Sequence, residues 1–126
     1  MNSRKPDVVD AIRALHPTAQ FTTNNGKIDG WHSSDITQPT EDAINAKLTE
    51  LNNEFPMKLL REERDRLIVQ SDWRVIKAKE TGTNIPTAWK TYRQALRDLP
   101  ANNTPTLDST GKRLNMTSVN WPTEPS

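Results

Sequence analysis

The sequence contains no cysteine and only two histidines among its 126 residues. A disulfide framework is therefore excluded, and a structural zinc site would lack the sulfur and imidazole ligands that it needs. The four glycines are isolated, so none forms the glycine-rich loop that cradles a phosphate, and no Gly-x-Ser-x-Gly motif supplies a nucleophile. We therefore expect no enzymatic activity, no catalytic residues, no bound metal and no cofactor.

Apolar residues are also scarce, at 33% of the chain against 26% charged residues. Such a chain buries a thin core, and with disulfides and metals excluded its stability should depend on a partner or on self-association. No apolar run approaches the roughly 18 residues of a membrane span, and no secretory leader is visible. The formal net charge of +1 offers no field that would attract nucleic acid or an anionic membrane. These absences predict a soluble cytoplasmic protein that binds other proteins through shape and local pairing.

Residues 1–55 predict a small unit made of a helix, a β-hairpin and a second helix. Apolar residues at helical spacing run from Pro6 to Leu15, with the proline suited to the first helical position. Two β-prone segments, 20–23 and 27–31, flank Asn25-Gly26, which is the preferred pair for a two-residue hairpin turn. These segments should therefore pair as antiparallel strands.

Two positions in this unit should interrupt regular structure. Ile28 and Trp31 have opposite parity along one strand, so both can be buried only if Gly30 forms a bulge or the strand ends early. The second helix should start after Thr40, its expected N-cap. Pro56 should end or kink that helix, because proline lacks the amide hydrogen and clashes with the preceding turn. We place the boundary between the first two subregions there.

Residues 56–100 predict a helical hairpin, and residues 101–126 predict an extended tail. The first helix of the hairpin should run from Met57 to about Gln70 and be followed by a polar loop through Gly82. The second should span Pro86 to about Asp98 and be stopped by the next proline. Its buried face should hold Trp89, Tyr92, Leu96 and Leu99. The apolar anchors that the tail offers are Leu107, Leu114, Met116, Val119 and Trp121. The fold class is thus α+β and mostly α.

The aromatic side chains of this hairpin can serve two purposes. Trp73, Trp89 and Tyr92 should pack the hairpin with most of their area, because tryptophan is usually the main packing element of a thin core. Any of them left partly exposed would instead be an anchor for a protein partner.

Charged side chains in the same region favour a structural role. A basic cluster in residues 58–66 alternates with acidic residues that cancel its field, so nucleic-acid binding is not indicated. Arg93 and Arg97 lie on one face of the last helix, and Asp72 and Asp98 are their natural ion-pair partners. We prefer this ion-pair network over anion binding, because neither a glycine loop nor an aromatic stacking platform accompanies the arginines.

Several stretches of the sequence resemble one protein family. They are the arginine-rich segment Leu59–Leu67, the triplet Ser71-Asp72-Trp73, the segment Trp89–Pro100 and the ending Trp121–Pro125. Together they are similar to the C-terminal unit of the tail-fibre assembly proteins, also called tail assembly chaperones, of tailed bacteriophages. Ser71 stands where this family usually has threonine, and the segment after Trp73 is more charged than the usual pattern.

The resemblance implies a protein that assists the folding, trimerisation or attachment of a tail fibre and that has no catalytic residues. Its partner would be the fibre or another tail protein, with a second copy of the chain, in a homo-oligomer, as a further candidate. We expect it to act in the host cell cytoplasm during assembly; the alternative is a structural component that stays in the virion tail. The expected partner-binding residues are Trp73, Trp89, Tyr92, Arg93, Arg97 and Trp121.

Overall fold

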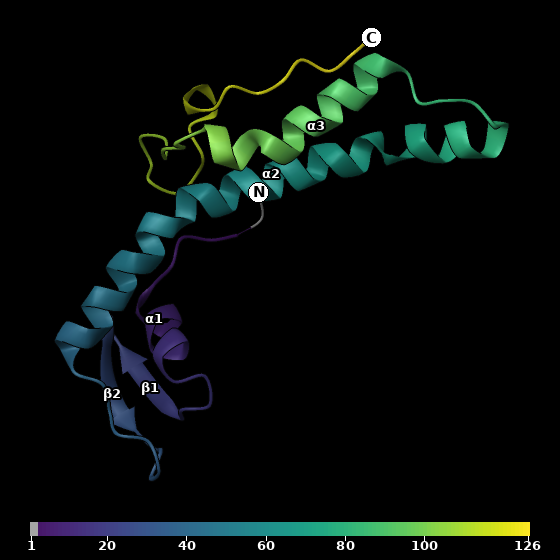
Figure 1. Ribbon diagram of the computed structural model, residues 1–126. Helices are drawn as coiled ribbons and strands as arrows, with labels where there is room; N and C mark the ends of the chain where they lie inside the picture. The colour runs from purple at the N-terminus through teal and green to yellow at the C-terminus, as the bar shows by residue number, and fades with distance from the viewer. Residues whose placement is uncertain (1–2) are drawn as a thin grey trace. The chain divides into compact units, whose positions relative to one another are not determined.

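The computed structural model of the protein describes residues 3–126 (Figure 1). Its regular elements are the helices α1 (Val8–Leu15), α2 (Glu41–Thr81) and α3 (Thr87–Asn102), the strands β1 (Phe21–Asn24) and β2 (Lys27–Trp31), and the 3₁₀ helix η1 (Met116–Ser118). This order confirms the mostly helical α+β fold. None of the helices in the described residues is long and apolar enough to cross a membrane.

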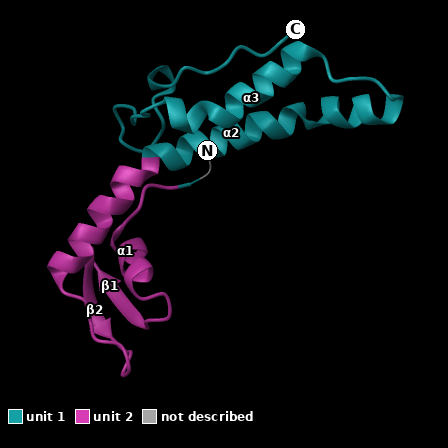
Figure 2. Ribbon diagram, viewed as in Figure 1, with its two compact units in different colours: residues 1–3, 56–126 teal, residues 4–55 magenta. Residues whose placement is uncertain are grey.

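The chain divides into two compact units, which Figure 2 colours separately. Residues 4–55 form one, called the N-terminal unit below. Residues 56–126 form the other together with Ser3, and it is called the C-terminal unit. Helix α2 contributes residues to both units, with the division between Phe55 and Pro56.

Helix α1 begins at Val8, two residues later than the sequence predicted. Asp7 is the N-cap of the helix, and its side chain accepts a hydrogen bond from the Asp10 amide at 3.1 Å. The Asp10 carboxylate accepts one from the Asp7 amide at 2.9 Å, which completes a capping box. Pro6 therefore precedes the cap, and the prediction that it occupies the first helical position is wrong. The box satisfies two amides that the helix leaves unpaired.

The hairpin has the predicted turn and a bulge at the residue before Gly30, where one was predicted. Asn25 and Gly26 both have positive φ, at 52° and 76°, as a two-residue turn of this twist requires. Thr22 pairs with Gly30 but Thr23 pairs with Ile28, so Asp29 is the extra residue of a bulge. The bulge corrects the parity of β2 and puts Ile28 and Trp31 against the same core. That core is centred on Ala11, Ile12 and Ile44.

Helix α2 does not end at either of two places where the sequence predicted an interruption, an end or a kink at Pro56 and an end after Gln70. It continues through Pro56, where the buried side chains of Phe55 and Leu59 flank the proline. Their burial stabilises the helical backbone enough to offset the one amide hydrogen bond that proline removes. The predicted loop after Gln70 is also helical, so the loop over residues 71–82 is wrong. Ser71 stays in the helix because its hydroxyl donates to the Ile68 carbonyl at 2.8 Å.

The actual end of α2 is at Gly82, whose φ is +68°. The Gly82 amide donates to the Lys79 carbonyl at 3.4 Å, and the Thr83 amide donates to the Ala78 carbonyl at 2.9 Å. This pair of bonds is the Schellman arrangement that commonly closes helices with a left-handed glycine. The helix therefore ends at the first glycine that follows Glu41 and not after Gln70, where the sequence predicted its end.

Helix α3 packs along α2 to form a hairpin (Figure 1). The four side chains predicted on one face, Trp89, Tyr92, Leu96 and Leu99, are all buried. The first three pack with Leu67 and Ile68 of α2. The helix continues to Asn102, so the prediction that Pro100 stops it is wrong; at this position proline removes a single bond of the last turn.

Residues 103–126 have little regular structure, but a β-bridge and backbone hydrogen bonds join distant positions within this segment. Leu107 and Leu114 form an isolated antiparallel bridge, and η1 follows. The Asn103 side chain accepts a hydrogen bond from the Asn120 amide at 2.9 Å, which joins the end of α3 to the segment after η1. Of the predicted anchors, Leu114 and Val119 are buried and Met116 is exposed. Two buried apolar side chains and the bond between Asn103 and Asn120 thus hold part of the tail in place.

Candidate functional site

Arg93 joins the two helices of the hairpin. Its guanidinium lies 2.9 Å from a carboxylate oxygen of Asp72, donates to the Ile68 carbonyl at 3.1 Å and donates to the Ser71 hydroxyl. Only 12% of the arginine side chain is exposed, whereas 46% of Asp72 is. The predicted ion pair between these two residues is confirmed. Its role is to fix α3 against α2, because both acceptors besides Asp72 belong to one turn of α2.

Arg97 does not form the predicted pair with Asp98. Its guanidinium donates to the Gln94 side chain at 3.0 Å, and the Asp98 carboxylate accepts from the same glutamine at 3.0 Å. Gln94 therefore stands between the two charges. Within residues 3–126 neither Arg97 nor the nearby Lys90 has an ion-pair partner.

Arg74 is a functional candidate that sequence reasoning missed. Its guanidinium lies 4.2 Å from the ring centroid of Trp73 and 4.1 Å from that of Trp89. One cation therefore lies against an exposed tryptophan of α2 and a buried tryptophan of α3. The adjacent Trp73-Arg74 pair is a signal in the sequence, but a loop predicted at these residues hides the helical neighbours that the pair has in α2.

An exposed apolar stripe runs along α2 over Val69, Trp73 and Ile76. These residues follow each other at four and three positions, so they share one face of the helix. Their exposed fractions are 67%, 50% and 57%, which is unusual for side chains of this size. Ser71, which is buried, lies about 200° around the helix from Trp73, so the stripe faces away from the packed side. We call these three residues the α2 stripe.

The remaining predicted site residues lie elsewhere in the C-terminal unit. Trp89 and Tyr92 are buried, and their rings meet edge to face at 5.7 Å, so they pack the hairpin. Trp121 is half-buried, and its indole nitrogen donates to the Met116 carbonyl at 3.1 Å. Trp89 and Tyr92 thus lie near Trp73, which shares Arg74 with Trp89, whereas Trp121 lies in the tail. The contact of the six predicted residues with a partner stays a prediction. Val69 and Ile76 were not among them.

The electrostatics of the hairpin include one perturbed phenol. Burial, and then the negative charge of Glu124, raise the pKa of Tyr92 above its ordinary value of 10.0. On α2 the hydrogen bonds from Arg66 lower the pKa of Glu63. Within residues 3–126 no group of three or more acidic or histidine side chains lies close enough to hold a metal ion.

Comparison with known proteins gives a match to a protein family. Residues 57–126 match a family model described as phage tail assembly chaperone protein, a region that covers more than half of the chain and nearly all of the C-terminal unit. No curated protein and no solved structure matches.

Proposed function

This chain belongs to the phage tail assembly chaperone family, and from that membership we propose that it binds a tail fibre while the phage tail is assembled. It covers an apolar segment of the incomplete fibre until the segment is buried in the finished structure. It acts by binding alone, in the host cell cytoplasm, and leaves the fibre once assembly is complete.

The observation that carries this proposal is the α2 stripe. Half or more of each of its three large apolar side chains is exposed, on a helix whose opposite face is already packed. Contiguous apolar surface of this kind on a small protein usually marks a site where another protein binds. Its helical spacing suits an apolar helix or strand laid along α2.

Trp73 is the expected anchor of this surface. Its ring already lies against the Arg74 guanidinium, and the Lys77 ammonium is 5.9 Å from the ring centroid. A ring held in this way loses less side-chain freedom on binding than a free one. Tryptophan beside arginine is also the composition that dominates interface hot spots.

Co-expression with the tail fibre of the same phage tests the proposal. Trp73→Ala should weaken co-purification with the fibre and lower the yield of assembled fibre, with a loss of affinity of about thirtyfold for a hot-spot tryptophan. Met116→Ser is the matched control, because it removes another exposed apolar side chain of the same unit, outside the stripe. Equal fibre yield and affinity with Trp73→Ala and the unaltered protein would contradict the proposal.

Mass spectrometry of purified virions tests the transient part of the role. A chaperone that leaves the fibre should be absent or far below the copy number of the fibre. Stoichiometric copies in the particle would instead support a structural component of the tail.

A further inference from the structure

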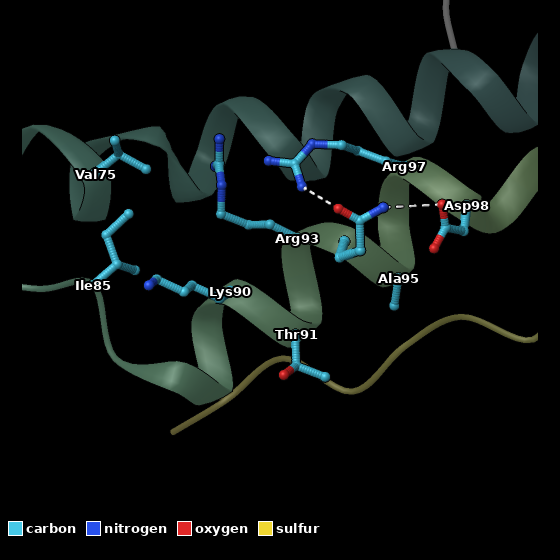
Figure 3. A pocket seen from close by; sticks show the side chains of 9 residues that line it. Val75, Ile85, Lys90, Thr91, Arg93, Ala95, Arg97 and Asp98 are labelled. Atoms are coloured by element: carbon cyan, nitrogen blue, oxygen red, sulfur yellow. Dashed lines mark hydrogen bonds between the residues drawn. The ribbon is translucent and has the colours of Figure 1, made fainter.

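A second candidate surface of the C-terminal unit is formed mainly by side chains of α3. An open groove of about 770 Å³ runs between α2 and α3 (Figure 3). Val75 and Ile85 lie together at one end, next to Lys90, and Arg97 lies toward the other end. The groove therefore has an apolar end and a basic side.

Two of the cations in this groove are free to meet a ligand. Arg93 is neutralised by Asp72 and is largely buried, so it belongs to the fold. Lys90 and Arg97 have no ion pair within residues 3–126, and both are exposed. The acidic residue of the lining, Asp98, is turned to Gln94, from which it accepts a hydrogen bond (Figure 3). Asp98 keeps its negative charge, but Lys90 and Arg97 together outweigh it, so the lining has a net positive charge beside its apolar end.

We propose that this groove binds an acidic, extended segment of a protein partner that carries one apolar residue next to its first acidic residue. The apolar side chain contacts Val75 and Ile85, and the carboxylates pair with Lys90 and Arg97. The proposal rests on the proposed function only in taking the segment from a tail protein.

The spacing of the two cations sets the pattern of the segment. Lys90 and Arg97 are seven positions apart on α3, which is about 10 Å along a helix axis. An extended segment in the polyproline II conformation advances about 3.1 Å per residue with three residues per turn, so two acidic residues three positions apart lie on the same side of the segment, about 9 Å apart. The expected pattern is apolar, acidic, any, any, acidic.

Nucleic acid fits this groove less well than such a segment. Single-stranded nucleic acid is usually held by a basic track together with aromatic rings on which bases stack. No aromatic residue lines the groove, and its apolar end offers nothing to a phosphate. An acidic protein segment with one apolar residue can contact both the apolar end of the groove and its two exposed cations.

The test is an NMR titration of the full chain with an end-blocked peptide Leu-Glu-Ala-Ala-Glu. We expect the amides of residues 85–97 to shift, with an affinity that falls as salt is added. The double variant Lys90→Gln/Arg97→Gln should bind about tenfold more weakly, from two exposed charge pairs. The glutamine peptide Leu-Gln-Ala-Ala-Gln should lose affinity in the same way.

Two controls separate this proposal from its rivals. Lys58→Gln/Arg61→Gln removes the same charge from exposed positions of α2 outside the groove and should leave binding unchanged. Trp73→Ala should also leave it unchanged, so the groove and the α2 stripe can fail independently. No shift at millimolar peptide, shifts outside the groove, or equal binding by the glutamine peptide would overturn the proposal. Displacement of the peptide by a single-stranded oligonucleotide of equal or higher affinity would assign the groove to nucleic acid and overturn it as well.

Discussion

Replacing Arg93 by methionine should loosen the helical hairpin more than the same replacement of Arg97. Methionine keeps much of the apolar stem of either arginine and removes only the guanidinium. In Arg93 that group makes three contacts with a single turn of α2, to Asp72, Ile68 and Ser71. In Arg97 it makes one, to an exposed glutamine of its own helix. Both variants remove one positive charge, but only Arg93→Met also removes contacts between α3 and α2.

The contacts set the expected size of the difference. A hydrogen bond from a charged donor contributes about 1.5–3 kcal/mol. The ion pair to Asp72 adds about 0.5 kcal/mol at most, because nearly half of that aspartate is in contact with water. Neither Ile68 nor Ser71 is left without a partner, since the serine hydroxyl still donates to the isoleucine carbonyl. We therefore expect Arg93→Met to lower the free energy of unfolding by about 2 kcal/mol and Arg97→Met by under about 0.5 kcal/mol.

Urea unfolding followed by tryptophan fluorescence measures both values, and native-state hydrogen exchange of the α3 amides locates the loss in the C-terminal unit. Asp72→Asn is an internal check, because it should cost less than Arg93→Met if the bonds to Ile68 and Ser71 dominate. Equal losses for Arg93→Met and Arg97→Met would refute the reasoning that places the stabilisation in these contacts.

Three further predictions use other parts of the chain. Trp89→Ala should cost about 3–5 kcal/mol and Trp73→Ala under about 1 kcal/mol in urea unfolding, because only the first ring is buried; the reverse order would contradict the packing described. Tyr92 is the only tyrosine, so phenolate absorbance reports its ionisation alone, and the midpoint should lie above pH 10. The unfolded phenol ionises first as the pH rises past 10, so stability should fall there, and Tyr92→Phe should remove that part of the fall. Gly26→Ala should destabilise the N-terminal unit by about 1 kcal/mol in thermal unfolding, because alanine disfavours the left-handed turn; an unchanged melting temperature would count against the turn geometry.

The sequence predicted the elements whose signals are local. The Asn25-Gly26 pair and the parity of Ile28 and Trp31 were enough to predict both the turn and the bulge. The ends of α2 and α3 were predicted less well. Pro56, Pro100 and the polar pair Ser71-Asp72 locally favour a helix end, but packing against other residues keeps these positions helical. Pro56 and Ser71 both lie inside α2, where buried neighbours and a backbone hydrogen bond compensate for their preferences.

Those errors at helix ends also determined what could be predicted of the site. Once a loop was assigned after Gln70, Val69, Trp73 and Ile76 could not be read as one face, although their spacing of four and three is plain in a continuous helix. The ion pair between Arg93 and Asp72 was predicted correctly, because the attraction of opposite charges does not depend on whether Asp72 lies in a loop or in a helix. The stacking of Arg74 on two rings depends on how α2 and α3 meet, which no local pattern contains.

The Arg74 guanidinium also gives the protein an optical property. It touches one indole in contact with water and one that is enclosed, so a change at either ring alters the surroundings of the cation that both share. Under the proposed function, a fibre segment bound at Trp73 would exclude water from that indole and move the Arg74 charge relative to the Trp89 ring. The tryptophan emission of the unlabelled chain should therefore shift to shorter wavelength when a partner binds, and the Trp73→Ala variant should not show that shift. Binding could then be followed by intrinsic fluorescence without an added label.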